Sequence, residues 1–174
     1  MVDAGALRRL IRDVPDFPSP GIVFRDITPL LADPAGLGSA VDHLAAPLRD
    51  LGLTHVAGIE ARGFLLAVPV AVALGVGFVP IRKPGKLPRS TATVSYALEY
   101  GRDTLEMHDD AFGEGARVAV LDDVLATGGT ARAAVDLVTG TGASVVAAAF
   151  LLELCALGGR DRLGGQQVES VLQY

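Results

Sequence analysis

Cysteine, histidine and lysine are all scarce in this sequence of 174 residues. The single cysteine, Cys155, excludes an intramolecular disulfide and a Cys-x-x-Cys metal site, and it fits a reducing cytoplasm. The 3 histidines are scattered without the spacing of zinc ligands. Lysine and arginine total 15 against 20 acids, and this net charge of −5 argues against nonspecific nucleic-acid binding. We expect no nucleic-acid partner, although the balance allows a local cationic pocket for an anionic ligand.

Charge is absent from residues 63–81, a stretch almost as long as a membrane-spanning helix. Pro69, Gly75 and Pro80 interrupt this stretch, which favours a buried helix followed by a buried strand. No apolar segment of a secretory signal follows the charged start of the chain. We therefore expect a cytoplasmic protein with no membrane partner.

Hydrophobic residues make up 50% of the chain and charged residues 20%, which excludes a disordered protein. The length suits a single α/β domain over residues 1–174. Strand and helix patterns alternate along most of the chain, which predicts a central, mostly parallel sheet flanked by helices. The expected strands are 55–60, 76–82, 91–96, 104–108, 117–122 and 144–151, and the expected helices are 7–14, 34–51, 64–74 and 130–138.

The most informative segment begins with two adjacent carboxylates, Asp122 and Asp123, at the carboxyl end of an expected central strand. Ligands of open α/β sheets bind at that edge. A loop of small residues then opens a helix, and it consists of Ala126, Thr127, Gly128, Gly129 and Thr130. Backbone N–H groups at the glycines, the threonine hydroxyls and the helix N-terminus together favour a phosphate group.

The sequence also limits which phosphate-containing ligand this loop could bind. No lysine follows the glycines, so the loop is not the P-loop of a nucleotide hydrolase. Asp122 and Asp123 would repel a bare polyphosphate, but they fit a ligand that presents ribose hydroxyls beside its phosphate. The alternative is an Asp-capped turn before a helix, without a ligand.

Cations occur in two further segments. Arg62 lies where an expected strand ends and a helix begins, and an arginine at a helix N-terminus is typical of an anion site. Residues 82–89 hold four cations, including Lys83 and Lys86, the only lysines of the chain. A flexible ammonium suits contact with a mobile pyrophosphate. Both segments are also compatible with ordinary solvated loops.

The Asp-Asp-x-x-x-Thr-Gly-Gly-Thr run resembles the phosphoribosyl-pyrophosphate signature of the type I phosphoribosyltransferases. The resemblance extends from about Pro15 to residues 172–174 through several separate motifs. It implies the type I phosphoribosyltransferase fold, with a base-binding hood over about 15–30 and a mobile lid over about 84–104. Within the family the sequence is similar to the enzymes that act on adenine. This implies purine salvage, in which adenine and phosphoribosyl pyrophosphate give AMP and pyrophosphate with Mg2+.

The resemblance assigns the base to the hood. Phe24 would stack on adenine with Val124 as the opposite wall, and backbone groups of Val23 and Arg25 would read the edge of the base. Without the resemblance, the preferred interpretation of residues 22–24 is that they are ordinary core residues beside a turn. Ala126 stands where enzymes for hypoxanthine and guanine usually place an acid, which favours adenine.

The resemblance also assigns the phosphoribosyl end and the chemistry. Phosphoribosyl pyrophosphate would be bound by Arg62, Arg82, Lys83, Lys86, Asp122, Asp123, Ala126, Thr127, Gly128, Gly129 and Thr130. Arg62 would stabilise the leaving pyrophosphate, and Glu99 would act as general acid/base. The substrate would carry the Mg2+, with contact to Asp122 and Asp123 through water. The cationic loop of related enzymes can reach a partner subunit, which implies a homodimer.

Two alternatives remain at this point. One is a phosphoribosyltransferase for another purine. The other is a nonenzymatic regulator that senses phosphoribosyl pyrophosphate and binds nucleic acid, but it would need a helix-turn-helix or a basic face, and the net charge argues against the latter.

Overall fold

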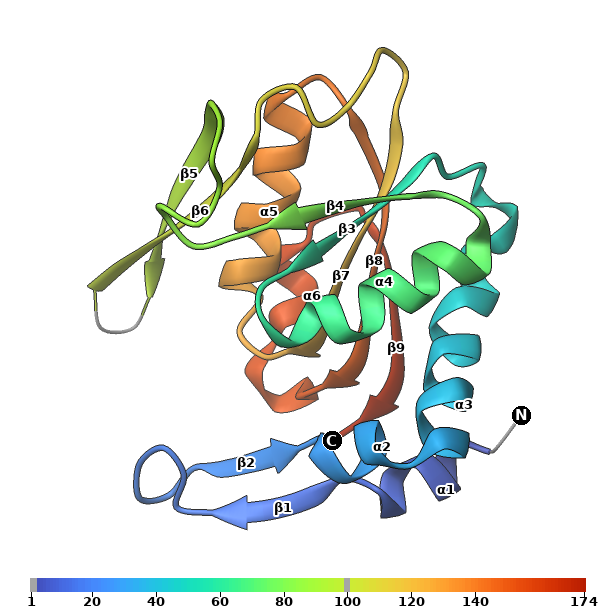
Figure 1. Cartoon of the computed structure of the whole chain (residues 1–174). Coiled ribbons are helices and arrows are strands. Elements are labelled where there is room, and N and C mark those ends of the chain that lie inside the picture. The colour runs from blue at the N-terminus through green and yellow to red at the C-terminus, as the bar shows by residue number, and fades with distance from the viewer. Residues whose placement is uncertain (1–2, 99–100) are drawn as a thin grey trace.

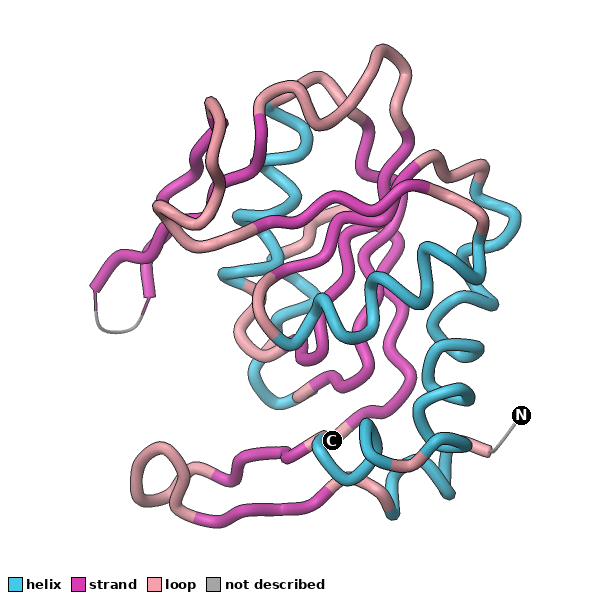
Figure 2. The backbone as a smooth tube through the Cα atoms, viewed as in Figure 1, coloured by secondary structure: helices cyan, strands magenta, loops and turns pink. Residues whose placement is uncertain are grey.

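The computed structural model describes residues 3–98 and 101–174. Its centre is a five-stranded parallel sheet, shown between its helices in Figures 1 and 2. In spatial order the strands are β4 (Gly77–Ile81), β3 (His55–Ile59), β7 (Arg117–Leu125), β8 (Ser144–Glu153) and β9 (Gln167–Gln173). The expected α/β class with a parallel sheet is therefore confirmed.

Helices cover both faces of this sheet. They are α1 (Ala4–Arg9), α2 (Thr28–Ala32), α3 (Pro34–Ala45), α4 (Arg62–Leu74), α5 (Gly129–Gly140) and α6 (Gly159–Arg162), with 3-10 turns at Ala46–Leu51 and Cys155–Leu157. Alternate residues of β7 point to opposite faces of the sheet. Ala119 and Leu121 pack in the core on the side of α3 and α4, whereas Val118 and Val120 pack on the side of α5. This explains the near-continuous apolar run in the sequence of β7.

Two antiparallel hairpins stand outside the main sheet (Figure 1). One pairs β1 (Arg12–Pro15) with β2 (Val23–Asp26) and contains part of the expected hood. The other pairs β5 (Thr91–Leu98) with β6 (Gly101–His108), as the alternating pattern predicted, and it packs against α5. No helix within residues 3–98 or 101–174 is long and apolar enough to cross a bilayer.

The expected helix over residues 7–14 is wrong in its second half. The helix α1 ends at Arg9, and the chain enters β1 at Arg12. Pro15 disfavours helical backbone at Val14, and Val14 instead pairs with Phe24 in the hairpin. Leu7 and Ile11 are nevertheless buried, so the apolar spacing marked core contact and not a continuous helix.

Several boundaries also differ from the expectation. The strand expected over 117–122 continues to Leu125, because it pairs with β8 as far as Glu153. The helix expected over 34–51 changes to a 3-10 turn after Ala45. The strand β9 and the short helices α2 and α6 were not expected from the sequence.

Candidate functional site

A hollow of about 230 Å3 opens at the carboxyl end of β7, where α5 begins. It brings together many of the residues that the sequence assigned to phosphoribosyl pyrophosphate, and Val124 from the base set also lines it. Its lining consists of Arg62, Asp122, Asp123, Val124, Leu125, Ala126, Thr127, Gly128, Gly129, Thr130 and Ala131.

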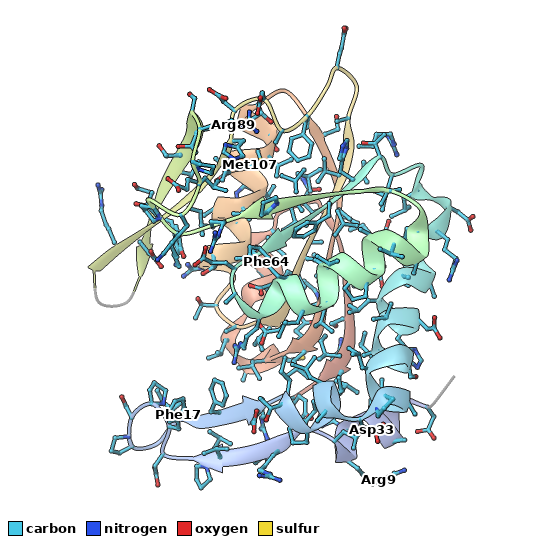
Figure 3. The ribbon with its side chains drawn as sticks, in the orientation of Figure 1. Arg9, Phe17, Asp33, Phe64, Arg89 and Met107 are labelled. Atoms are coloured by element: carbon cyan, nitrogen blue, oxygen red, sulfur yellow. The ribbon has the colours of Figure 1, made fainter. Side chains whose placement is uncertain are left out.

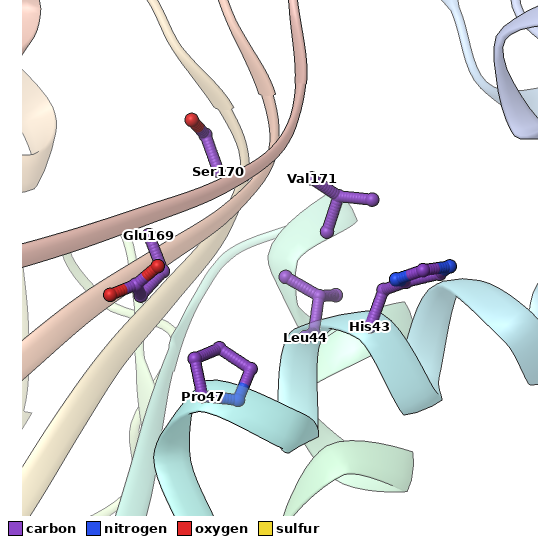
Figure 4. A pocket seen from close by; sticks show the side chains of 6 residues that line it. All are labelled: His43, Leu44, Pro47, Glu169, Ser170 and Val171. Atoms are coloured by element: carbon purple, nitrogen blue, oxygen red, sulfur yellow. The ribbon is translucent and has the colours of Figure 1, made fainter. Parts of the chain in front are cut away.

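A second hollow of about 160 Å3 lies between α3 and β9 (Figure 4). His43, Leu44 and Pro47 line it from the helical side, and residues 169–171 from β9. None of the expected site residues lines this second hollow or a third one of about 280 Å3 beside β4, so the hollow beside β7 is the candidate site.

The loop that opens α5 is shaped for an anion. Gly128 precedes the helix with a φ of +79°, a conformation that favours glycine. No side chain in the described part of the chain caps this helix, so its first N–H groups stay available. The hydroxyl-bearing residues Thr127 and Thr130 line the same hollow. This geometry suits a phosphate group, and we call residues 126–130 the phosphate cradle; the bound phosphate itself stays a prediction.

Two acids lie beside this loop within β7. Oδ1 of Asp122 accepts a hydrogen bond of 2.8 Å from the backbone N–H of Asp123. The side chain of Asp123 is 5% exposed, and its Oδ2 lies 2.8 Å from Nε of Arg62. Despite this short distance, Oδ2 of Asp123 has no hydrogen-bond partner among the described residues, so Arg62 and Asp123 form an ion pair without a well-aligned hydrogen bond.

Burial controls the ionisation of both acids. Burial, followed by the neighbouring charge of Asp123, raises the pKa of Asp122 well above its usual range. Burial also raises the pKa of Asp123, against the opposing effect of the Arg62 guanidinium. The state in which both acids are ionised is therefore disfavoured. A cation or hydroxyl donors from a ligand would stabilise the two negative charges.

Arg62 is the first residue of α4, and Gly63 brings it to the acids. A Cβ atom at Gly63 would lie 2.8 Å from Oδ1 of Asp122 and 3.1 Å from the carbonyl oxygen of Leu121. Only a glycine lets the start of α4 approach β7 this closely. The peptide bond just before this helix, between Glu60 and Ala61, is cis.

The hood contacts the candidate site through Arg62. The Arg62 guanidinium carbon lies 5.0 Å from the ring centroid of Phe24. Phe24 in turn packs edge-on against Phe17, near the tip of the hood hairpin in Figure 3, with ring centroids 5.1 Å apart. Val23 is 45% exposed. A Phe24 face opposite Val124 stays a prediction.

The side chain of Arg25 is turned to other partners. It forms an ion pair with Asp13, and its guanidinium carbon lies 4.3 Å from the ring centroid of Tyr174. Its backbone groups are therefore the part of Arg25 that can read a base, which is the role the sequence assigned to them.

The cationic loop after β4 is held by acids and does not line the hollow. Oε2 of Glu60 accepts from Nε of Arg82 at 2.8 Å and from the backbone N–H of Lys83 at 3.0 Å. The Lys83 ammonium forms an ion pair with Asp103, and Lys86 is exposed. The loop is thus ordered near the site with its two lysines outside the hollow.

The contact between Tyr96 and Thr130 was not predicted from the sequence. The Tyr96 hydroxyl lies 3.1 Å from Oγ1 of Thr130 and 3.1 Å from Oδ2 of Asp103. It therefore ties the β5–β6 hairpin to the phosphate cradle. Glu99, the expected acid/base, lies outside the described residues.

Comparison with known proteins identifies the family. Residues 31–164 match the phosphoribosyl transferase domain. The adenine phosphoribosyltransferase of Carboxydothermus hydrogenoformans is 55% identical over 168 residues, which are 97% of this chain and 99% of that protein. The chain belongs to the adenine phosphoribosyltransferase family.

Solved structures of adenine phosphoribosyltransferases have the same fold. The enzyme from Thermoanaerobacter pseudethanolicus superposes with a TM-score of 0.96 at 47% identity, over 98% of this chain and 99% of that one. The enzyme from Saccharomyces cerevisiae gives 0.91 at 38% identity, over 97% of each chain, and was solved with adenine and an imino-altritol bisphosphate. The type I phosphoribosyltransferase fold, hood included, is confirmed for this member of the adenine phosphoribosyltransferase family.

Proposed function

We propose that this protein transfers the phosphoribosyl group of phosphoribosyl pyrophosphate to adenine, giving AMP and pyrophosphate in purine salvage. One observation carries the proposal: an uncapped helix N-terminus and two buried acids line the same hollow. The first suits a 5′-phosphate and the second suits the 2′ and 3′ hydroxyls of a ribose. Together they select a phosphorylated ribose over a free phosphate or a free sugar.

The base lies on the hood side of this sugar. Adenine is flat and uncharged, so it needs apolar faces and a few directed hydrogen bonds. Phe24, next to Arg62, supplies an aromatic face. Ala126 in the cradle brings no acid to the base, which supports adenine over hypoxanthine or guanine.

The transfer breaks one bond and forms another at C1 of the ribose. N9 of adenine bonds to this carbon, and pyrophosphate leaves with the electron pair of its C1–O bond. The charge that grows on the leaving group is stabilised by Arg62 in the hollow. Lys83, Lys86 and Arg82 would add to this from the neighbouring loop, once Lys83 leaves Asp103.

We propose Mg2+ as the cofactor, carried by the substrate. Asp122 and Asp123 fit it, because both are acids that line the hollow, and Oδ2 of Asp123 has no hydrogen-bond partner among the described residues. No cluster of three metal-binding side chains occurs in the described ranges, so phosphates and water would complete the coordination. When bound, the ion would neutralise charge on the pyrophosphate.

We propose Glu99 as the group that manages the proton of the attacking base. Attack by N9 requires the loss of its proton, and Ala126 leaves the cradle without a base. Glu99→Ala should lower kcat much more than the affinity for phosphoribosyl pyrophosphate, as steady-state kinetics would show. Lost affinity with turnover retained would contradict this role.

Steady-state assays with four bases test the whole proposal. The enzyme is given phosphoribosyl pyrophosphate, Mg2+ and either adenine, hypoxanthine, guanine or xanthine. We expect AMP from adenine and at least a hundredfold lower kcat/KM for the other three. Preferred turnover of another base would reassign the substrate, and no turnover of any base would refute the transferase.

We further propose a homodimer in the cytoplasm. Leu65, Val68 and Val72 form a stripe on one side of α4 and are 51%, 43% and 77% exposed. An apolar stripe of this kind is typical of a contact surface. A reducing cytoplasm suits the exposed free thiol of Cys155.

A further inference from the structure

The phosphate cradle rests on a backbone segment that does not line the hollow. A Cβ atom at Gly159 would lie 2.2 Å from the carbonyl oxygen of Ala126 and 3.0 Å from the backbone nitrogen of Gly128. A Cβ atom at Gly128 would likewise lie 2.4 Å from the carbonyl oxygen of Gly159. The two backbones are therefore in direct contact, and the position of Gly159 limits where the N–H groups of the cradle can point.

Gly159 begins α6, a helix of four residues. Such a short helix has almost no stability of its own. Figure 1 shows α6 beside the end of α5 at which the cradle enters that helix. Something outside α6 must therefore fix it.

The next residue, Arg160, provides that anchor. Its Nε lies 3.0 Å from Oε1 of Glu153, and its Nη2 lies 2.6 Å from Oε2. Its Nη1 also donates to the carbonyl oxygen of Val168 at 2.7 Å. The guanidinium thus binds the last residue of β8 with a fixed, two-pronged geometry and also joins α6 to Val168 near the start of β9.

Glu153 is itself firmly held. It is the last residue of β8 and is 5% exposed. The hydroxyl of Ser170 on β9 donates to its Oε2 at 2.6 Å. Burial and the Ser170 hydrogen bond, both independent of Arg160, leave this carboxylate little freedom to move, so it fixes the position of Arg160 and of the preceding Gly159.

We propose that Glu153 and Arg160 are positioning residues for the 5′-phosphate, acting through the backbone contact of Gly159 with Ala126 and Gly128. This inference rests on the proposed function and assigns a role to residues that touch no substrate. A displacement of under an ångström in the cradle misaligns its N–H groups from the phosphate oxygens, which weakens each hydrogen bond. The groups that we propose for the sugar hydroxyls, Asp122 and Asp123, lie in β7, and those for the base lie mainly in the hood, so binding of the sugar and base should be largely unaffected.

The ratio of the affinities for adenosine and AMP isolates the phosphate, because the two ligands differ only in that group. We would measure both dissociation constants by equilibrium titration for the wild type, Arg160→Lys, Arg160→Gln and Gly159→Ala. Arg160→Lys keeps the positive charge and loses the paired hydrogen bonds of the guanidinium to Glu153, and Gly159→Ala changes no charge at all. Arg117→Gln is the matched control, because Arg117 also bonds a backbone carbonyl, that of Leu51, at the opposite end of β7.

We expect the preference for AMP over adenosine to fall at least tenfold in each Arg160 and Gly159 variant, with adenosine binding within twofold of the wild type. The control should keep the full preference. An unchanged preference in folded Arg160→Lys and Gly159→Ala would overturn the inference, as would an equal loss for both ligands. A wild type without any preference for AMP would instead refute the proposed function.

Discussion

The ionisation of a single residue, Asp122, should make ligand binding at the candidate site depend on pH. A carboxyl group with a raised pKa is ionised only above that raised value, and the pKa of Asp122 is raised well above 3.8 by burial and by Asp123. If Asp122 binds the ribose hydroxyls as we propose, its protonation weakens it as their acceptor. The affinity for phosphoribosyl pyrophosphate should therefore fall as the pH drops through the raised pKa, well before an ordinary aspartate takes up a proton.

The measurement is KM for phosphoribosyl pyrophosphate between about pH 8 and pH 5, in the wild type and in Asp122→Asn. The substrate phosphates titrate near pH ~6 in both proteins, so their effect cancels in the comparison. We expect a higher KM in the variant, and a ratio of variant to wild type that shrinks toward acid pH. Parallel profiles would show that Asp122 does not titrate in this range.

Tyr96 competes with the ligand for Thr130. The carboxylate of Asp103 is the stronger acceptor and accepts the hydrogen bond of the Tyr96 hydroxyl, so Thr130 donates to the Tyr96 oxygen. Phosphate binding must break that Thr130 hydrogen bond. Tyr96→Phe should therefore lower KM for phosphoribosyl pyrophosphate about two- to fivefold, the equivalent of roughly 0.5–1 kcal/mol for one hydrogen bond.

Ser95→Ala is the control for that variant. Ser95 lies on the same hairpin and bonds Oγ1 of Thr104 at 2.9 Å. It should change the stability slightly and leave KM unaltered. A higher KM in Tyr96→Phe would mean that the tyrosine orients Thr130 for the phosphate.

Among the individual site residues, the sequence predicted those that are close together in the chain. The cradle could be predicted because its glycines, threonines and acids are neighbours in the chain. The Tyr96 contact with Thr130 spans 34 positions, and no periodicity or composition signals it. The anchor at Gly159 was missed for the same reason, since it depends on Glu153 and on a strand that was not expected.

The hood is attached to the main sheet by a stack of three side chains. The ring of Tyr174, just beyond β9, lies 4.1 Å from the guanidinium carbon of Arg8 and 4.3 Å from that of Arg25. Each such contact stabilises by about 0.5–1 kcal/mol. Arg25 belongs to β2, so this stack fixes the strand that carries Phe24.

Tyr174→Ala should therefore raise KM for adenine about fivefold and leave KM for phosphoribosyl pyrophosphate within twofold. The two KM values are measured in the same steady-state assay. Tyr174→Phe keeps the ring and should behave like the wild type. An equal rise in both KM values would show that the stack supports the whole site and not the hood alone.

Elements were predictable where pattern and pairing agree. The strand pairing of 91–96 with 104–108 was confirmed, because polar and apolar residues alternate there. The helix over 7–14 failed because apolar spacing cannot distinguish a helix from a turn that buries the same side chains. The strand β9 was missed because Gln167–Gln173 mixes polar and apolar residues on a half-covered edge.

The stripe on α4 predicts assembly of the whole molecule. Val72 is 77% exposed, and a glutamate there would place a charge in the proposed interface. Val72→Glu should convert the proposed dimer to a monomer at micromolar concentration, as sedimentation equilibrium would show. Leu157→Glu is the control, because Leu157 is 49% exposed but lies outside α4. A wild-type monomer, or a variant that stays dimeric, would contradict the interface.

The separate hood hairpin also has an evolutionary consequence. Residues 12–15 and 23–26 pair with each other in a two-stranded sheet, whereas the acids lie in β7 of the five-stranded sheet and the cradle directly follows that strand. If the hood selects the base as we propose, mutations in the hairpin that spare Phe24 and its contact with Arg62 should alter the choice of nucleobase with little effect on binding of the activated sugar. A lineage built this way can diversify its products while conserving one donor, and protein engineers could graft foreign hoods onto the same scaffold.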